Sequence, residues 1–463
     1  MTDPADLTLV ELLPLLAARS LSARELLADC LARVERWEPE VQAFVTLTPE
    51  IAGRAAEAAD DARAAGRPVG LLAGVPVALK DLYCTRGVPT TASSRVLAGY
   101  DPGIDAAVWT RLREAGAGLL GKTTLHEFAY GTGSFPTRNP WDLERTPGGS
   151  SGGSAAALAA RMVPVATGTD TGGSLRIPAA ACGVSSLRPT SGRVSAYGVL
   201  PLSHSLDATG PMARRMRDIG LLLGLLAGHD PRDPHSLDEP VPAYPSDARH
   251  DLTGVRIGLP TACFWDDADP QIAAGCLSGL QRLVDRGAEL VEVAPPAATQ
   301  RILGVPGTYG VTMGIEALEH HAGWLAEREE LYGDAVRRRF AEAREVTVEQ
   351  YAEAQQDRLR WADEWRRIVG EAQLDAVAHP TIPQPPGLVG PDGRGPGPTI
   401  GLAKAWSVAR FPSLSVPVGL DDRGLPVGLL LAGLPEHEAS LLGLGITIDE
   451  DVQLWRRSPL PSG

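Results

Sequence analysis

Residues 147–176 of this 463-residue chain read PGGSSGGSAAALAARMVPVATGTDTGGSLR. Two glycines precede Ser150 and two precede Ser174. Such pairs let a backbone bend sharply and approach a ligand closely, because they carry no Cβ atom. Between the serines, the small residues of 153–160 predict a tightly packed helix, and the apolar run of 162–170 predicts a strand. Two serine-bearing turns joined by a helix and a strand predict a site built on an α/β core.

The regions on both sides of this stretch alternate between helix and strand patterns. Helix 22–38 begins with a capping box formed by Ser22 and Glu25, and Pro39 is expected to follow its end. The other predicted helices cover 50–65, 105–115, 213–228, 270–286 and 315–372, and the predicted strands cover 70–81, 117–122, 254–260, 288–294, 413–419 and 425–433. This alternation predicts an α/β fold with a mostly buried sheet.

No internal repeat and no clean linker interrupts the chain, so we expect one domain over residues 1–463. The helices of about 1–65 and about 315–372 are expected to lie at its periphery. Residues 229–247 are rich in proline and acidic side chains, with few apolar anchors, and predict a surface loop.

The charge balance and the apolar pattern narrow the class of protein. The chain has 43 Lys and Arg against 57 Asp and Glu, a formal net charge of −14, so it lacks the basic surface that non-specific nucleic-acid binding needs. No apolar run approaches the roughly 18 residues of a membrane span. The N-terminal stretch has no basic segment and Glu11 interrupts it, unlike a secretory signal. We therefore expect a cytoplasmic protein that binds neither nucleic acid nor membrane.

The five cysteines are scattered and form no C-x-x-C pair, which predicts free thiols and no structural zinc.

Residues 116–123 (GAGLLGKT) match the phosphate-loop pattern G-x-x-x-x-G-K-[ST]. A phosphate loop follows a strand and opens a helix, so that its N–H groups converge on phosphate. Here a helix precedes the match, and Leu119 and Leu120 give its middle the character of a strand. We therefore expect no nucleotide site, and Lys122 is interpreted as a solvated or structural lysine.

The second serine turn has the composition of a site that binds an oxyanion. Successive N–H groups in 170–174 (DTGGS) can converge on a developing negative charge beside the Ser174 hydroxyl. A serine nucleophile also needs a base, and the chain has no G-x-S-x-G elbow. Lys80 ends the apolar run GVPVAL, where burial would lower its pKa and leave a neutral amine as the base. Taken singly, Ser150 could cap a helix, Ser174 could be a turn serine and Lys80 could lie at the surface.

Several segments together resemble the amidase signature enzymes. They are GVPVALKD (74–81), PGGSSGGSAAA (147–157), GTDTGGSLRIPAAACGVSSLRPT (168–190), SAYGVLPLSHSLDATGPMAR (195–214) and GLPVGLLLAG (424–433). The resemblance covers nearly the whole chain. It implies a large mixed β-sheet core covered by helices on both faces.

The resemblance also implies a catalytic triad of two serines and a lysine. Ser174 would be the nucleophile, Ser150 the bridging serine held by a cis peptide bond, and Lys80 the base. The backbone N–H groups of an oxyanion hole would belong to Thr171, Gly172, Gly173 and Ser174. No metal and no cofactor is implied.

The same resemblance places residues 125–134 (LHEFAYGTGS) along the acyl pocket. Tyr130 and Gly131 are the candidate substrate-binding residues, with core packing as an equal interpretation of Tyr130. His126 is interpreted as structural. Asp170 and Arg176 are interpreted as hydrogen-bonding supports of the nucleophile's loop.

The resulting functional hypothesis is a stand-alone bacterial-type amidase that cleaves a small aryl or aliphatic amide through an acyl-enzyme on Ser174. Three alternatives stay open: a carbamate or allophanate-type hydrolase, one component of a tRNA-dependent amidotransferase (its A-type chain), and a catalytically idle binding protein. For glutamine, an arginine such as Arg410 could hold the substrate carboxylate. The expected partner is a small amide or carbamate, and association into a homodimer is left open.

Overall fold

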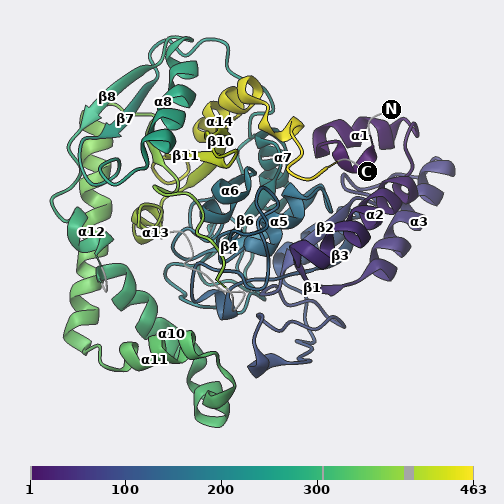
Figure 1. Ribbon diagram of the computed structural model, residues 1–463, viewed down its shortest axis with the longest axis horizontal. Helices are drawn as coiled ribbons and strands as arrows, with labels where there is room; N and C mark the ends of the chain where they lie inside the picture. Colours follow the sequence, from purple (N-terminus) through teal and green to yellow (C-terminus); the bar gives the residue numbers. More distant parts are fainter. Residues whose placement is uncertain (1–2, 305–306, 391–400, 462–463) are drawn as a thin grey trace.

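The computed structural model describes residues 3–304, 307–390 and 401–461. These residues form an 11-stranded sheet with the order β1-β3-β2-β4-β6-β5-β10-β11-β9-β7-β8 (Figure 1). The strands are β1 (Phe44–Leu47), β2 (Pro76–Lys80), β3 (Gly118–Thr123), β4 (Val165–Asp170), β5 (Ser185–Arg188), β6 (Ala208–Ala213), β7 (Arg256–Pro260), β8 (Glu289–Val293), β9 (Ala376–Pro380), β10 (Ser413–Leu420) and β11 (Pro426–Ala432). Parallel pairs link β3, β2 and β4, and also β9, β7 and β8. Antiparallel pairs link the strands between β4 and β9, so the predicted large mixed sheet is confirmed.

Helices cover both faces of this sheet. They are α1 (Leu9–Ala17), α2 (Ala23–Val41), α3 (Pro49–Ala64), α4 (Ala107–Glu114), α5 (Gly152–Ala159), α6 (Arg176–Cys182), α7 (Met216–Leu226), α8 (Pro270–Val284), α9 (Thr299–Leu303), α10 (Gly307–Arg328), α11 (Asp334–Arg344), α12 (Val348–Glu371), α13 (Lys404–Ala409) and α14 (Glu438–Val452). In β11, Val427 lies against Gly275 of α8, whereas Gly428 lies against Ala180 of α6. Because successive residues of a strand point to opposite faces, α8 and α6 lie on opposite sides of the sheet.

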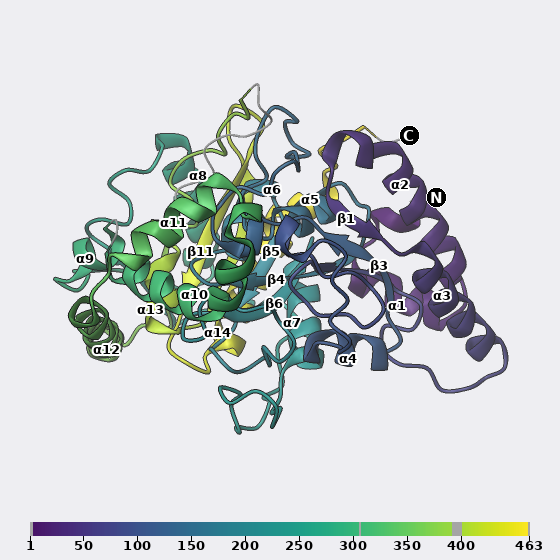
Figure 2. The same cartoon turned by 90° about the horizontal axis from the view of Figure 1, so that it is seen from below.

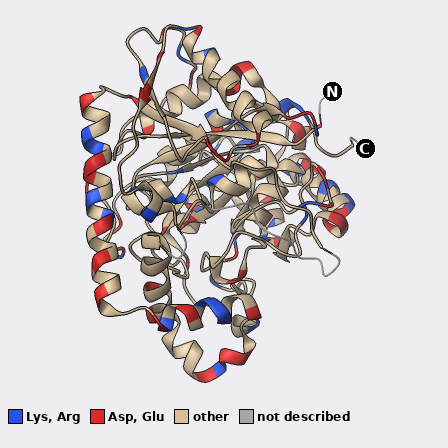
Figure 3. Cartoon of the chain, turned by 60° about the vertical axis from the view of Figure 1, so that its left-hand side comes forward, with Lys and Arg blue, Asp and Glu red and all other residues tan. Residues whose placement is uncertain are grey.

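The two ends of the molecule are helical. α1, α2 and α3 lie at one end and α10, α11 and α12 at the other, with the sheet between them (Figure 2). Acidic and basic residues are interspersed along the outer helices (Figure 3). Among the described residues, every helix is too short or too polar to cross a membrane.

The topology brings the ends of two distant segments together. β2 and β4 are adjacent and parallel, so their last residues, Lys80 and Asp170, lie at the same edge of the sheet. The turns that follow these strands therefore meet there, as they do at the carboxyl ends of parallel strands generally.

The helix α5 between the serine turns is packed as its composition predicts. A Cβ atom on Gly153 would lie 2.6 Å from the backbone nitrogen of Thr124 and 2.5 Å from the carbonyl oxygen of Ala43. Only a residue without a side chain fits between these backbones.

Several predicted boundaries are wrong, among them the start of the helical region expected at 315, since α10 begins at Gly307. The strand expected over 70–81 begins only at Pro76, because 70–75 form a turn in which Ala73 N–H donates to Gly70 and Val75 N–H donates to Leu72. The helix that begins at the Ser22 capping box continues through Pro39 to Val41. A proline in a last turn removes one hydrogen bond without ending the helix there.

The strands β1, β5, β6 and β9 have no counterpart in the sequence prediction. β6 reads ATGPMA, a poor strand composition, yet it pairs with both β4 and β5. The hydrogen bonds to a neighbouring strand on each side stabilise β6 although its residues have low strand propensity, since strand preference depends mainly on context.

Candidate active site

Lys80 ends β2 with its side chain enclosed, at 0% exposure. Its Nζ lies 2.7 Å from Ser150 Oγ and 2.7 Å from Thr169 Oγ1. Burial lowers the pKa of Lys80 to about 7, against the opposing fields of Asp170 and Asp207. Removing the ammonium from water disfavours its charged form, so a neutral amine is accessible near neutral pH.

Ser150 lies in the turn before α5, and the Gly149–Ser150 peptide bond is cis, as the resemblance implies. Its carbonyl oxygen accepts hydrogen bonds from Ser134 Oγ at 3.0 Å and from the His126 N–H at 3.3 Å. The N-cap of α5 is Ser151, whose side chain makes no capping bond. The Ser150 hydroxyl contacts Lys80 instead, and because Ser151 occupies the N-cap, the capping alternative for Ser150 is wrong.

Ser174 lies in the turn between β4 and α6, and 3% of it is exposed. Its carbonyl oxygen accepts a hydrogen bond from the Ser151 N–H at 3.2 Å. The two serine turns predicted from the sequence are therefore bonded directly to one another, beside Lys80.

The turn 171–174 is organised by the buried carboxylate of Asp170. Its Oδ1 accepts the Gly173 N–H at 2.8 Å, and its Oδ2 accepts the Leu175 N–H at 3.1 Å. Gly173 has φ +124°, a left-handed conformation that suits glycine. The Gly173 N–H assigned to an oxyanion hole is thus bonded to Asp170 instead. No hydrogen bond within the described part of the chain uses the N–H groups of Thr171, Gly172 or Ser174.

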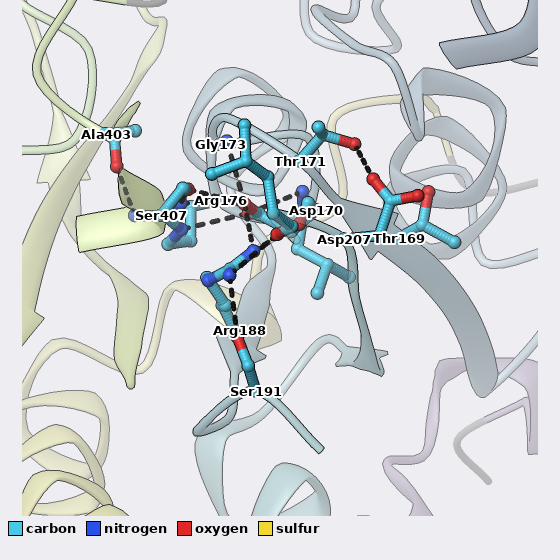
Figure 4. A network of polar contacts seen from close by, with 12 residues as sticks. Thr169, Asp170, Thr171, Gly173, Arg176, Arg188, Ser191, Asp207, Ala403 and Ser407 are labelled. Carbon is cyan, nitrogen blue, oxygen red and sulfur yellow. Dashed lines mark hydrogen bonds and ion pairs between the residues drawn. The ribbon is translucent and has the colours of Figure 1, made fainter. Parts of the chain in front are cut away.

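Two arginines hold Asp170 in place (Figure 4). Arg176 donates to both carboxylate oxygens, at 3.0 and 2.8 Å, and Arg188 Nη1 lies 3.2 Å from Oδ1. Although burial raises the pKa of Asp170, these guanidinium groups hold it well below its usual value. Asp170 and Arg176 support the loop through hydrogen bonds, as the sequence interpretation expects.

The candidate substrate-binding residues Tyr130 and Gly131 are both covered by other side chains. Tyr130 is buried, with its ring 5.3 Å from that of Phe340 and its carbonyl oxygen bonded to Arg339. A Cβ on Gly131 would lie 2.3 Å from His126 Nε2, so the imidazole rests directly on Gly131. Tyr130 therefore packs in the core, the alternative already given for it.

A cavity of about 370 Å³ adjoins this region. Its lining includes Leu125, His126 and Phe135 on one side and residues 333–336, at the start of α11, on the other. The backbone N–H of His126 also donates to the Ser150 carbonyl oxygen. His126 therefore lies between the cavity and the Ser150 turn.

The sequence alone did not identify four neighbours of the serine turns. A Cβ on Gly172 would lie 2.4 Å from Tyr309 Oη, and one on Gly173 would lie 2.7 Å from Ala403 Cβ. Thr169 contacts Lys80, and Asp207 contacts Thr171. Only Thr169 and Asp207 fall in motif segments, and nothing local to the sequence links Tyr309 or Ala403 to this turn.

The phosphate-loop match is structural. Lys122 is buried within β3, where its Nζ lies 2.9 Å from Asp81 Oδ1 and 2.9 Å from Thr90 Oγ1. Within the described residues, no group of three His, Cys, Asp or Glu side chains is placed to hold a metal ion.

Known proteins resemble this chain over nearly its full length. The A-type chain of the glutamyl-tRNA(Gln) amidotransferase of Chloroflexus aggregans is 41% identical, with 96% of each chain aligned. The solved peptide amidase of Stenotrophomonas maltophilia superposes with a TM-score of 0.83 at 32% identity, covering 98% of both chains. A chain solved in work on a vestigial protein complex that reveals the evolutionary origins of an s-triazine catabolic enzyme superposes with a TM-score of 0.88 at 32% identity, covering 96% of this chain and 98% of that chain.

A model of the amidase family matches residues 25–442 and so includes all the residues described above from Lys80 to Ala403. Members of this family act on C–N bonds other than peptide bonds. This chain belongs to the amidase family, with the signature serine turns and buried lysine in place.

Proposed function

We propose that the chain hydrolyses a carboxamide through an acyl-enzyme on Ser174, with Ser150 and Lys80 relaying the proton. The observation that carries this proposal is the 2.7 Å contact between Lys80 Nζ and Ser150 Oγ inside the protein. A lysine is long and flexible, and an intervening hydroxyl that both accepts and donates can transmit its basicity to a second serine.

The proposed relay moves protons in two linked steps. Neutral Lys80 takes a proton from Ser150, which takes one from Ser174 as the Ser174 oxygen attacks the carbonyl carbon. The relay then protonates the leaving nitrogen, and the C–N bond breaks. Water attacks the acyl-enzyme by the same route and releases the acid.

The developing oxyanion needs hydrogen-bond donors that are fixed in advance. The N–H groups of Thr171, Gly172 and Ser174 are the candidates, because Gly173 is engaged with Asp170. This role for the turn remains part of the proposal.

The relatives favour one alternative substrate. The 41% identity to the A-type chain of an amidotransferase makes glutamine hydrolysis a second candidate function. One candidate for the substrate carboxylate is the Arg339 guanidinium, which bonds to the Tyr130 carbonyl and lies 5.4 Å from the Tyr130 ring centroid. Arg410 stays a second candidate, because it lines a cavity of about 100 Å³ together with Thr169 and Asp207, which contact Lys80 and Thr171.

The test is a hydrolysis panel with the purified chain. The panel contains an aryl anilide, an aliphatic primary amide, an aryl carbamate and glutamine, each with wild type, Ser174→Ala and Ser150→Ala. Ser154→Ala is the matched control, because Ser154 lies in the same block but bonds to Thr123 and to the Thr167 carbonyl. We expect Ser154→Ala to retain turnover and the other two variants to lose it.

The pattern of substrates separates the candidate functions. Turnover of the anilide or the aliphatic amide by the chain alone supports a stand-alone amidase, and preference for the carbamate supports the carbamate hydrolase. Cleavage of glutamine only, and only with a second protein present, supports the amidotransferase component. If no substrate is turned over and Ser174 is not acylated, the result supports a catalytically idle binding protein.

A further inference from the structure

The turn 171–174 is held by a carboxylate at each end. Asp170 binds the N–H groups of Gly173 and Leu175. At the other end, Thr171 Oγ1 donates to Asp207 Oδ1 at 2.5 Å (Figure 4). Asp170 precedes the turn directly, whereas Asp207 reaches it from a loop that lies before β6.

Asp207 is itself fixed by its own loop. Its Oδ2 accepts the N–H groups of Leu202 at 2.9 Å and Ser203 at 3.0 Å. The neighbouring carbonyl of Leu206 accepts a hydrogen bond from Arg188 at 2.8 Å, and Arg188 also contacts Asp170. Arg188 therefore links the carboxylate of Asp170 to the backbone of the loop that carries Asp207.

We propose that Asp207 is a positioning residue for the reaction: through Thr171 it fixes the direction of the turn's N–H groups, and its charge acts on Lys80. This inference rests on the proposed function, because it assigns a role to the turn in that chemistry. Donors that stabilise a transition state must be held in place before the reaction, and small displacements of such groups are costly.

The electrostatic part rests on the short path between the two groups: Thr169, which lies 2.7 Å from Lys80 Nζ, lines the same cavity of about 100 Å³ as Asp207. The negative charge of Asp207 favours the protonated form of Lys80 and so opposes the lowering of the Lys80 pKa by burial. Burial raises the pKa of Asp207, and its hydrogen bonds from Thr171, Ser203 and Leu202 oppose that rise. The other charged or titratable groups near Asp207 are Arg188 and, around the cavity of about 100 Å³ that it lines, His204, Asp233, His235 and Arg410.

The hydrogen bond is tested with Thr171→Val and Thr171→Ser. The readout is the rate at which a fluorophosphonate probe labels Ser174, since that reaction needs the nucleophile, its base and the oxyanion donors but no knowledge of the substrate. We expect Thr171→Val to label about 10- to 100-fold more slowly, and Thr171→Ser to recover most of the wild-type rate, because serine keeps the hydroxyl. Thr167→Val, in the strand β4 that leads into the turn, is the matched control, because the Thr167 hydroxyl has no hydrogen-bond partner among the described residues.

The charge is tested with Asp207→Asn through the pH dependence of labelling. Without the negative charge, the protonated form of Lys80 is less favoured, so the rise of the rate with pH should move to lower pH. Thr171→Val retains the charge, and its rise should stay at the wild-type pH. If Asp207→Asn does not fold, the comparison between Thr171→Val and Thr171→Ser still decides the positioning role.

The outcomes separate this inference from the proposed function. Absence of labelling at Ser174 in the wild type would reject the proposed function itself. Wild-type labelling together with an equal rate in Thr171→Val would reject the positioning role. A rise that stays in place or moves to higher pH in folded Asp207→Asn would reject the action of the charge on Lys80.

Discussion

The N–H of Ser151 donates to the carbonyl oxygen of Ser174 at 3.2 Å, and this bond ties together two turns that belong to different segments of the motif. On one side of it, Ser150 contacts Lys80; on the other, Asp170 and Asp207 hold the turn of Ser174. We therefore expect a change in either turn to displace the other.

Replacing Ser174 with alanine should abolish turnover and leave the fold intact. The hydroxyl is small and lies in a glycine-rich turn, so its loss should hardly change the melting temperature. Loss of a serine nucleophile costs several orders of magnitude in kcat. Steady-state kinetics and thermal unfolding, measured side by side, check both parts. More than a few per cent of residual activity would contradict the assignment.

Activity should rise with pH through about 7, because Lys80 must be neutral to accept a proton and burial lowers its pKa to about that value. The measurement is the pH profile of kcat/KM between pH 5 and 9. A flat profile with rate-limiting chemistry would argue against a lysine base.

The same burial should leave a signature in stability. The ordinary pKa of lysine is 10.5, so between about pH 7 and 10.5 the unfolded chain binds a proton at Lys80 that the folded chain does not. The contribution of Lys80 to stability therefore rises with pH across that range and is least favourable at pH 7 and below. We expect Lys80→Met to stabilise the fold relative to wild type, and the gain should shrink as the pH approaches 10. Thermal unfolding of both proteins as a function of pH measures this difference, and a gain that grows with pH would be inconsistent with a buried amine.

Gly131→Ala should reduce activity, because its Cβ would lie 2.3 Å from His126 Nε2 and force the imidazole to move. His126 lies next to Ser150 through its backbone and lines the cavity of about 370 Å³. Gly53→Ala is the matched control, since no atom lies within 4 Å of its added methyl group. Kinetics of both variants should show a loss of turnover for Gly131→Ala alone; equal activity would mean that the ring moves freely.

Lys122→Met should destabilise the protein by about 3 kcal/mol, because it leaves the buried carboxylate of Asp81 without its cation. Denaturant unfolding measures the loss. ATP should not shift the melting temperature of the wild type, since the lysine of the phosphate-loop match is already paired inside the protein. A melting temperature that rises with ATP would instead support a nucleotide site at the phosphate-loop match.

Much of the site could be predicted from one short stretch of sequence. The paired glycines, the serines at 150 and 174 and the apolar run ending at Lys80 are local features, and local features carry their own physical requirements. The same holds for the helix that starts at Ser22 and for the tightly packed α5.

The tertiary structure decided what lies around that stretch. β2 and β4 become neighbours only through the sheet, and this adjacency brings Lys80 to Ser150. The strand β6 forms despite its glycine and proline because both of its edges are paired.

The sequence also could not predict the directions in which the backbone N–H groups of the turn 171–174 point. The stretch DTGGS indicated an oxyanion turn, but φ +124° at Gly173 and the acceptor on Asp170 withdraw one of its N–H groups. Tyr309 and Ala403 reach the turn from segments that share no local pattern with it, and Asp207 reaches it from a separate motif segment. The sequence by itself indicated two serine turns and a buried lysine, because paired glycines and an apolar run are local features, and the resemblance to a family supplied the roles proposed for them. Only the packing of distant segments decided which groups face them, because side-chain contacts across a sheet depend on register and topology.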